Sequence, residues 1–217
     1  MTQLAAAIFD MDGLLIDSEP LWQDAEISCL RPLGLPITRD LCRASAGRRL
    51  DEVLADWYQR FGWQGPGPEH MHGPILDEVT RLVLSRGAAL PGARETMARV
   101  RAAGLKTAIA SSSPHRLIDA VVARLDLGSL LDLTHSGVDE VRGKPDPAVF
   151  LTTAKRLGIK PEQCLVFEDA PAGVIAAHRA GMRVIAVPSV VGLDHPDFRV
   201  AEQVLSDLTH FTLESLA

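Results

Sequence analysis

The chain lacks the features that would place it in a membrane or in an oxidising compartment. No apolar run approaches the roughly 20 residues that a bilayer span needs, and residues 2–9 are too short for a signal peptide and lack its basic start. Cys29, Cys42 and Cys164 are odd in number and have no C-x-x-C spacing, which indicates reduced, packed thiols. We therefore expect a cytoplasmic protein with no membrane partner, and we expect it to be a monomer.

The chain is also poor in positive charge and in nucleotide-binding motifs. Its net charge is −6 and no run of lysine or arginine occurs, which argues against a nucleic-acid partner. Neither G-x-G-x-x-G after the first strand nor G-x-x-x-x-G-K-[ST] is present. His70 and His72 lie in a Gly- and Pro-rich stretch, so we expect exposed loop residues there, with no spacing that indicates a metal site. An anionic substrate would need local positive charge.

The order of the predicted elements indicates an α/β fold with a helical insert. Strand patterns are expected at residues 4–9, 105–110, 164–167 and 183–188, and helices in the same part of the chain at 92–103, 114–125, 147–157 and 171–180. The intervening segment is helical, at about 21–33, 39–44, 51–61 and 75–84. We predict a doubly wound, Rossmann-like parallel sheet formed by residues 1–17 and 86–217, with an all-helical insert over 18–85.

Two carboxylates close the first predicted strand. Asp10 and Asp12 follow its apolar run and precede Gly13. Ligands of open α/β sheets bind at the carboxyl ends of the strands, and an unpaired carboxylate away from water is costly, so these acids indicate a cationic or reactive partner. Asp10 could attack a substrate and Asp12 could move a proton. The alternative is a polar turn that only closes the strand, because Asp-Gly is common in turns.

Hydroxyl groups and a lysine follow later in the chain. Ser111, Ser112 and Ser113 come directly after a strand and before a helix, where hydroxyls and free backbone N–H groups can bind an anion. Lys144 precedes Pro145, which biases the lysine backbone toward an extended conformation and so fixes where its ammonium points. Each has a plainer alternative, because Ser113 can simply cap the helix and a loop lysine is usually solvated.

A second acid pair follows the strand at residues 164–167. Glu168 and Asp169 could merely complement the dipole of the next helix. Acid pairs at two strand ends would repel each other, however, unless a hard cation such as Mg²⁺ lies between them, and oxygen atoms are the ligands that Mg²⁺ prefers. The sequence therefore predicts one site at one sheet edge, formed by Asp10, Asp12, Ser111, Lys144, Glu168 and Asp169.

In their order along the chain, these strand-end residues resemble the motifs of the haloacid dehalogenase superfamily of phosphotransferases. The matching motifs are Asp10-Met11-Asp12-Gly13, Ser111, Lys144 and Glu168-Asp169. The resemblance covers essentially the whole chain, and it implies that the insert is the small helical cap shared by β-phosphoglucomutase and many sugar phosphatases. Residues 12–22 look closest to the hexitol phosphatases, also described as 2-deoxyglucose-6-phosphate phosphatases. Carbon–halogen hydrolysis is disfavoured, because the dehalogenases lack the second aspartate.

The resemblance implies a role for each motif. Asp10 would attack phosphorus to give an aspartyl phosphate, while Asp12 would protonate the leaving alkoxide and later deprotonate the attacking water. Mg²⁺ would be bound by oxygen atoms of the Asp10 carboxylate, the Asp12 backbone carbonyl, Asp169 and, directly or through water, Glu168. The phosphate would be held by Ser111, the backbone of Ser112, and Lys144, which also neutralises charge in the transition state.

Residues of the insert bear on the substrate. Mutases of the β-phosphoglucomutase type carry a histidine where this chain has Trp22, so the resemblance favours transfer to water over return to a sugar. Segment 47–51 is similar to a substrate-facing cap loop, so Arg49 or Arg48 could contact the leaving group, and a solvated basic face is the alternative. Trp22 could bind substrate or pack, and Glu19 is similarly open. We expect a Mg²⁺-dependent phosphomonoester hydrolase acting on a small sugar or polyol phosphate.

Three other functions agree with parts of this pattern. A β-phosphoglucomutase-like mutase remains the alternative within the same family. A phospho-acceptor signalling domain also uses a doubly wound sheet, an acidic cluster, Mg²⁺ and a Lys-Pro pair, but it needs no helical cap and carries its phosphorylated aspartate on a middle strand. A catalytically inactive binding protein would lack at least one of the four motifs, and all four are present.

Overall fold

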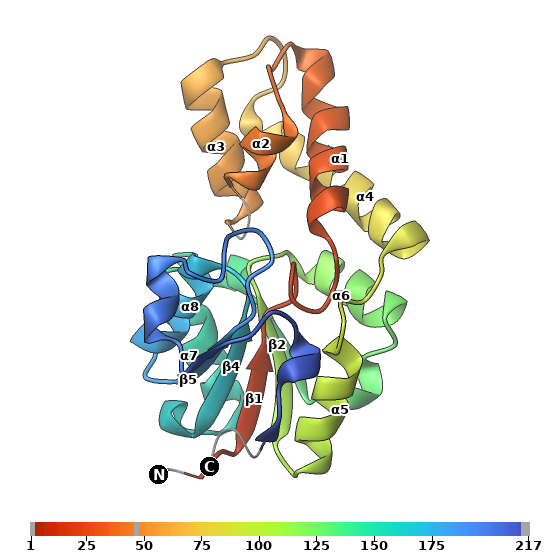
Figure 1. Ribbon diagram of the computed structural model, residues 1–217. Helices are drawn as coiled ribbons and strands as arrows, with labels where there is room; N and C mark the ends of the chain where they lie inside the picture. The colour runs from red at the N-terminus through yellow and green to blue at the C-terminus, as the bar shows by residue number, and fades with distance from the viewer. Residues whose placement is uncertain (1–2, 46–47, 214–217) are drawn as a thin grey trace.

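The computed structural model describes residues 3–45 and 48–213, and a six-stranded parallel sheet lies at its centre (Figure 1). The strand order is β3-β2-β1-β4-β5-β6, so the chain starts in the middle of the sheet and extends it in both directions. The strands are β1 (Ala6–Phe9), β2 (Lys106–Ser111), β3 (Leu133–Ser136), β4 (Cys164–Glu168), β5 (Arg183–Ala186) and β6 (Gln203–Val204). This is the predicted doubly wound α/β fold.

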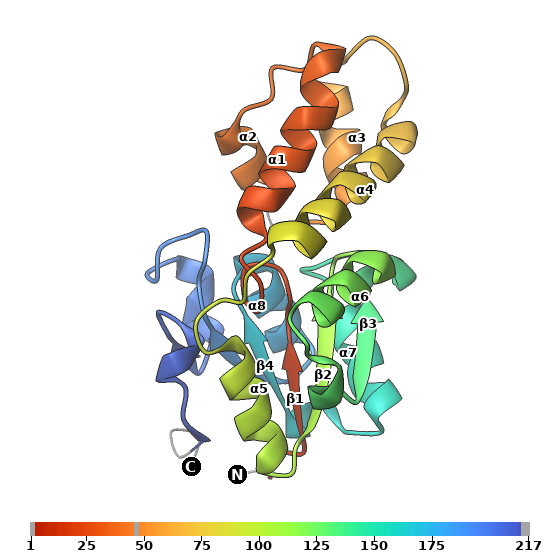
Figure 2. The ribbon, with the colours of Figure 1, turned by 90° about the vertical axis from the view of Figure 1, so that its right-hand side faces the viewer.

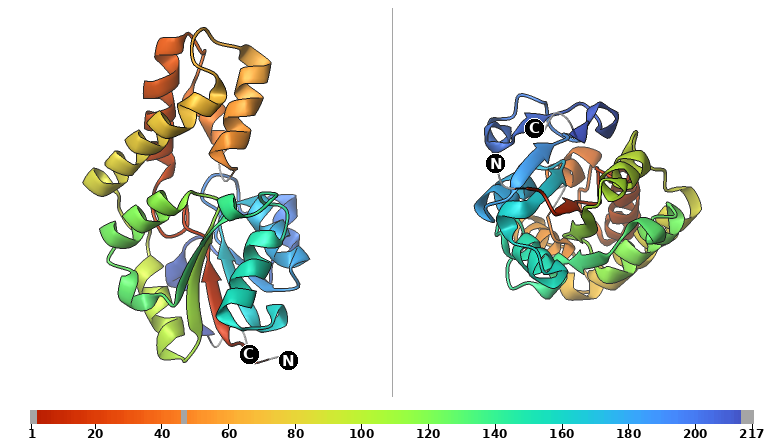
Figure 3. Two further views of the ribbon diagram at one scale, coloured as in Figure 1. Left: turned by 180° about the vertical axis from the view of Figure 1, so that it is seen from behind. Right: turned by 90° about the horizontal axis from the view of Figure 1, so that it is seen from below.

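Helices cover both faces of the sheet and bury β1 completely. Ala7 and Phe9 belong to one apolar core, Ala6 and Ile8 belong to the other, and all four side chains are fully buried. Figure 3 shows the helices on the two sides of the sheet. They are α5 (Ala93–Ala102) and α6 (His115–Arg124), which share the core of Phe9, and α7 (Ala148–Leu157) and α8 (Pro171–Arg179), which share the core of Ile8. The residues that follow Phe9 are thus held at a rigid strand end.

A separate group of helices stands above the carboxyl ends of the strands (Figures 1 and 2). These helices are α1 (Glu19–Leu30), α2 (Arg39–Arg43), α3 (Leu50–Phe61) and α4 (Pro68–Arg86), and they form the cap. Two chain segments join the cap to the sheet, and they run side by side. Ile16 of one pairs with Ala89 of the other, and the Asp17 N–H donates to the Ala88 carbonyl at 3.0 Å. The cap is therefore positioned directly over any site at the strand ends.

The cap also contains the largest departure from the predicted elements. Helix α4 begins at Pro68, not near residue 75, so His70 and His72 lie in a helix and the loop prediction for them was wrong. Gly73 and Pro74 indicated a break, but Met71 and Ile75 continue one buried apolar face of the helix, and packing of that face outweighs the proline. The two-residue strand β6 and the short strand β3 were not predicted.

None of the helices in the described part of the chain has both the length and the apolar character needed to cross a bilayer. Cys29, Cys42 and Cys164 are free thiols, and the last two are buried.

Candidate active site

The predicted site residues come together at the carboxyl edge of the sheet. Asp10 follows β1, Ser111 ends β2 and Glu168 ends β4, while Lys144 reaches the same place from the loop between β3 and α7. The parallel register brings these ends level, because Phe9 lies opposite both Ile109 in β2 and Phe167 in β4. Residues that are far apart in the sequence but follow these strands therefore lie close together in space.

Lys144 is the cation at the centre of the cluster. Its ammonium donates to Asp10 Oδ1 at 2.5 Å, to Glu168 Oε1 at 2.7 Å and to the Ala110 carbonyl at 3.3 Å. Burial alone would lower the pKa of Lys144, but the two adjacent carboxylates outweigh burial and raise it, so the side chain stays protonated. Lys144 thus supplies the local positive charge that an anionic substrate would need in this acidic protein.

The carboxylates around Lys144 outnumber it. Burial raises the pKa of Asp10 to about 7 against the attraction of Lys144, and Glu168 adds to the increase. Burial, followed by the charges of Glu168 and Asp10, raises the pKa of Asp169 well above its usual range. Burial is the larger cause of both shifts, and the charges of the neighbouring carboxylates add to it. A site of this kind becomes favourable when further positive charge binds.

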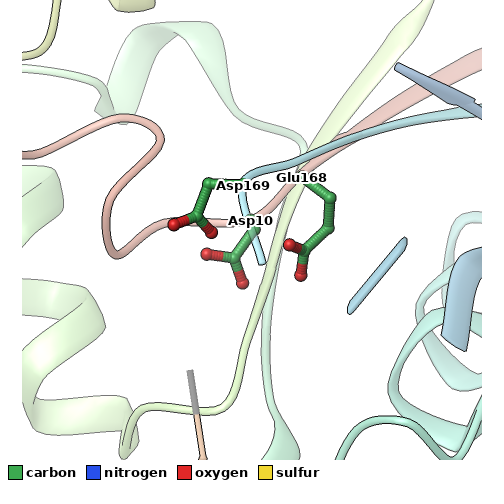
Figure 4. Close-up of side chains that lie close together, drawn as sticks. All are labelled: Asp10, Glu168 and Asp169. Carbon is green, nitrogen blue, oxygen red and sulfur yellow. The ribbon is translucent and has the colours of Figure 1, made fainter. Parts of the chain in front are cut away.

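The donor set fits a hard divalent cation. Asp10, Glu168 and Asp169 each place a carboxylate oxygen within 4.8 Å of the others, and Figure 4 shows the three side chains converging from β1 and β4. Both Glu168 oxygens already have partners, since Oε1 accepts from Lys144 and Oε2 accepts from the Ala170 N–H at 2.8 Å. The direct ligands are therefore expected from Asp10 and Asp169, with Glu168 holding Lys144 beside them.

Asp12 occupies a different hydrogen-bond environment from the other acids. Its Oδ1 accepts from Ser18 Oγ at 2.6 Å and from Trp22 Nε1 at 3.0 Å. Its Oδ2 accepts from Ser113 Oγ at 2.7 Å and, at 3.4 Å, from Ser111 Oγ. Serine hydroxyls can donate to a carboxylate and can also rotate to accept from a carboxylic acid, so these neighbours can accommodate both protonation states. That property suits a residue that gives and takes a proton.

The serines that end and follow β2 contact Asp12 and line the cavity, where we expect an anion to bind. Ser113 does not cap α6, because Pro114 is the N-cap residue and the Ser113 hydroxyl bonds to Asp12. Ser111 Oγ accepts from the Ser113 N–H at 3.0 Å, and its own proton makes only the long 3.4 Å contact to Asp12 Oδ2. Ser111, Ser112 and Lys144 all line that cavity, next to Asp10.

Two glycines make room for the acids. Gly13 has φ +76°, and a Cβ there would lie 2.3 Å from Asp169 Oδ2 and 2.6 Å from Ser189 Oγ. A Cβ on Gly173 would lie 1.6 Å from Glu168 Oε1. Ser189 itself donates to Asp169 Oδ2 at 2.5 Å and so orients this carboxylate. The backbone thus packs closely against these carboxylates at the turn after β1 and at the start of α8.

A cavity of about 390 Å³ lies between the strand ends and the cap. Its cap wall includes Trp22 and Arg48, whereas the Arg49 guanidinium donates to Asp51 Oδ2 at 2.7 Å and to the Glu140 carbonyl at 3.1 Å and does not line the described cavity. Arg48 is exposed, with its guanidinium 3.9 Å from the Asp56 carboxylate. Gly47, which belonged to the predicted cap loop, lies outside the described residues.

Several site residues escaped the sequence analysis. Ser189 comes shortly after β5 at the same sheet edge, so the strand-end argument applied to that strand would have found it. Ser18 was not predicted, and Trp22 was predicted only as a substrate-binding or packing residue; their spacing of four residues puts both beside Asp12. Glu26 and Cys42 also line the cavity, and nothing in the sequence indicated which way they face.

Comparison with known proteins identifies the class of enzyme. Residues 4–181 match the family model described as haloacid dehalogenase-like hydrolase. Hexitol phosphatase B of Escherichia coli (strain K12) is 39% identical over 215 residues, which cover 99% of this chain and 97% of that protein. The phosphorylated carbohydrates phosphatase of Thermotoga maritima is 35% identical over 182 residues, 84% of each chain.

A solved structure extends the likeness to the fold. CbbY from Rhodobacter sphaeroides, in complex with phosphate, superposes with a TM-score of 0.88 and 21% identity, covering 99% of both chains. At that identity the agreement concerns the sheet and its cap. The family model and the two relatives also show the enzyme class. The chain is a phosphatase, and it belongs to the haloacid dehalogenase-like hydrolases.

Proposed function

We propose that the protein is a Mg²⁺-dependent phosphomonoester hydrolase that acts on a small sugar or polyol phosphate through an aspartyl phosphate on Asp10. The observation that carries the proposal is the placement of Asp10. It lies at the floor of the cavity, bonded to Lys144 through one oxygen, with Asp169 beside it and Asp12 two residues further along the chain. A nucleophile, a cation, metal-binding oxygens and a proton carrier thus share one cavity.

In the first step, an Asp10 carboxylate oxygen attacks phosphorus in line with the bond to the leaving oxygen. The new bond forms between Asp10 and phosphorus as the bond to the alkoxide breaks, and Asp12 in its acid form gives the alkoxide a proton. Ser111, the Ser112 backbone and Lys144 bind the phosphoryl oxygens, on which charge accumulates in the transition state. The product is a free polyol or sugar and a phosphorylated Asp10.

In the second step, water attacks the phosphorus of the aspartyl phosphate. Asp12, now a carboxylate, accepts the proton of the attacking water, and the bond between phosphorus and Asp10 breaks to release inorganic phosphate. Both steps use the same proton carrier in opposite directions. The hydroxyls of Ser18 and Ser113, which can donate or accept, allow Asp12 to alternate between its two forms.

Mg²⁺ would be held by Asp10, the Asp12 backbone carbonyl and Asp169, with Glu168 close by, and when bound it supplies positive charge that offsets the repulsion between an anionic nucleophile and a phosphate. The raised pKa values of Asp10 and Asp169 support this assignment, because burial and the neighbouring carboxylates disfavour the charged forms that a bound cation would stabilise. Ser189 would keep Asp169 turned toward that position.

The relatives and the cavity together support the proposed substrate class. The names of the relatives describe enzymes for hexitol phosphates and phosphorylated carbohydrates, and a cavity of about 390 Å³ suits a small leaving group. We propose that residues 1–17 and 86–217 form the catalytic domain and residues 18–85 the cap that closes over the leaving group. A cytoplasmic location and a monomeric state stay predictions.

The proposal is tested by phosphate release from sugar, polyol, glycolate and nucleotide monophosphates, with Mg²⁺ and with chelator. We expect release only with the metal, strongest for a sugar or polyol phosphate, and none from Asp10→Asn. Asp119→Asn, at an exposed position of α6, is the matched control and should behave as wild type. Turnover by Asp10→Asn, or in chelator, would contradict the mechanism. Isomerisation of β-glucose 1-phosphate that outpaces release would instead support the mutase alternative.

A further inference from the structure

Glu26 is a buried acid of the cavity wall that the proposed mechanism does not use. It lies on α1 and is 7% exposed, and it lines the cavity together with the Cys42 thiol of α2. Burial raises the pKa of Glu26 to about 7, and its side-chain hydrogen bond is with Cys42. Among residues 3–45 and 48–213, no ion pair involves Glu26. A thiol is a weak partner for a carboxyl group.

Folding gains little from such a group. A buried carboxyl without a cation costs free energy, and an apolar side chain of similar size would serve the packing of a cap helix better. The cap side of the same cavity also includes Leu50 and Val53, which are apolar and buried. A polar group that is costly for folding and faces a substrate cavity is expected to have its partner in the ligand.

The position of Glu26 relates it to the leaving group. Trp22, one turn earlier on the same face of α1, donates to Asp12 at 3.0 Å. A helix rises about 1.5 Å per residue, so Glu26 lies roughly 6 Å further along the axis than Trp22. Because α1 runs away from the sheet (Figure 1), this direction leads away from the phosphate position toward the far end of the cavity.

The charge around Glu26 limits what that end can accept. Arg43 and Arg48 also line the cavity, but both are exposed and lie near acids, with Arg43 3.1 Å from Asp40 and Arg48 3.9 Å from Asp56. Among the described residues of the cap wall, both arginines therefore have an acidic neighbour, whereas Glu26 has no cation beside it. Hydroxyl groups can donate to that acid, whereas a phosphate or carboxylate would be repelled.

We propose that Glu26 recognises the leaving group, binding hydroxyls of a neutral polyol or sugar and disfavouring substrates with a second anionic group at that end. This inference rests on the proposed function and specifies it. It assigns specificity to the first cap helix, on the side of the cavity opposite Lys144. Cys42 then serves as the neighbour that fills the wall behind the carboxyl group.

The test compares kcat/KM for a hexitol 6-phosphate and for phenyl phosphate, whose leaving group carries no further hydroxyl. Glu26→Leu should lower the value for the hexitol phosphate about tenfold to a hundredfold, as loss of a hydrogen bond to a charged group does, and leave phenyl phosphate unchanged. Glu26→Gln keeps the shape without the charge, so its loss should be smaller, while kcat/KM for a hexose bisphosphate should rise. Glu69→Gln, an exposed acid of α4, is the matched control.

A stability measurement separates recognition from a structural role. If Glu26 is retained for the ligand, Glu26→Leu should melt no lower than wild type. Equal losses for both substrates, or no loss for either, would overturn the proposal, and Glu26→Gln decides the matter alone if Glu26→Leu does not fold. Failure of the proposed function would look different, because wild-type protein would then hydrolyse none of these phosphomonoesters, and the inference would fall with it.

Discussion

Replacing Lys144 by methionine tests how the site balances its charges. The Lys144 side chain is 4% exposed and is shared by Asp10 and Glu168, at 2.5 and 2.7 Å. Methionine keeps the length of the side chain and removes the charge. Removal of one partner from a buried ion pair costs about 3–5 kcal/mol of folding free energy, because the remaining charge is left without compensation.

The structure indicates the lower end of that range and a dependence on pH. Without Lys144, the carboxylates of Asp10, Glu168 and Asp169 remain within 4.8 Å of one another. Two like charges at that separation repel by about 3 kcal/mol at an effective dielectric constant of roughly 20. Protonation of Asp10, whose pKa is already raised to about 7, relieves part of this repulsion at low pH. The loss should therefore grow as pH rises through neutrality, where that proton is released.

Urea unfolding of wild type and Lys144→Met, in chelator and in saturating Mg²⁺, measures the effect. We expect a loss of about 3 kcal/mol in chelator above neutral pH, a smaller loss with Mg²⁺, and at most about 0.5 kcal/mol for the exposed control Lys155→Met. Mg²⁺ should reduce the loss because it brings charge to the same oxygens. A loss of equal size with and without Mg²⁺, or none in chelator, would refute the charge balance described here.

Three further changes probe other parts of the molecule. Gly173→Ala places a Cβ only 1.6 Å from Glu168 Oε1, so it should lower the free energy of unfolding, measured in urea, by about 1–3 kcal/mol. An unchanged unfolding curve would show that the Glu168 side chain moves aside freely. Trp22→Phe removes a donor to Asp12 and should lower kcat about tenfold with little change in KM, measured by steady-state kinetics, whereas a change confined to KM would indicate a substrate contact. The pKa of Glu26 is raised on folding from 4.5 to about 7, so wild type should lose more stability than Glu26→Gln as pH rises through that window, because the raised pKa of Asp10 is common to both proteins. The difference between their free energies of unfolding should grow by about 3 kcal/mol across the window, and a constant difference would show that Glu26 titrates normally.

The fold and the catalytic edge followed from one local rule. A parallel strand buried on both faces reads as an apolar run, and polar residues directly after such runs must meet at one edge, as Asp10, Ser111 and Glu168 do. Lys144 was harder to predict, because it follows no predicted strand. It was included because it precedes Pro145 and matches a motif of the family. Ser189 was missed although the same rule covers it, since it follows β5 by only a few residues.

The cap was less predictable for a physical reason. Its side chains lie on helices, and a helical position fixes a face only relative to neighbouring helices, whose packing the sequence does not state. Arg48 and Arg49 are adjacent, yet Arg48 lines the cavity while Arg49 bonds to Asp51 and to a backbone carbonyl. The start of α4 was misplaced for the same reason, because burial of Met71 outweighs a Gly-Pro signal that is strong in isolation.

The predictable strand ends and the less predictable cap also contribute different contacts to the site. The contacts of Lys144 with Asp10 and Glu168 lie wholly among strand ends, so they do not depend on where the cap sits. Asp12 is held from both sides, by Ser113 of the core and by Trp22 of the cap. In the proposed mechanism, proton transfer is therefore the step whose geometry depends on the cap, and the cap is also where the leaving group that receives the proton would bind. Coupling the two means that a leaving group that fits the cap also secures the position of its proton donor.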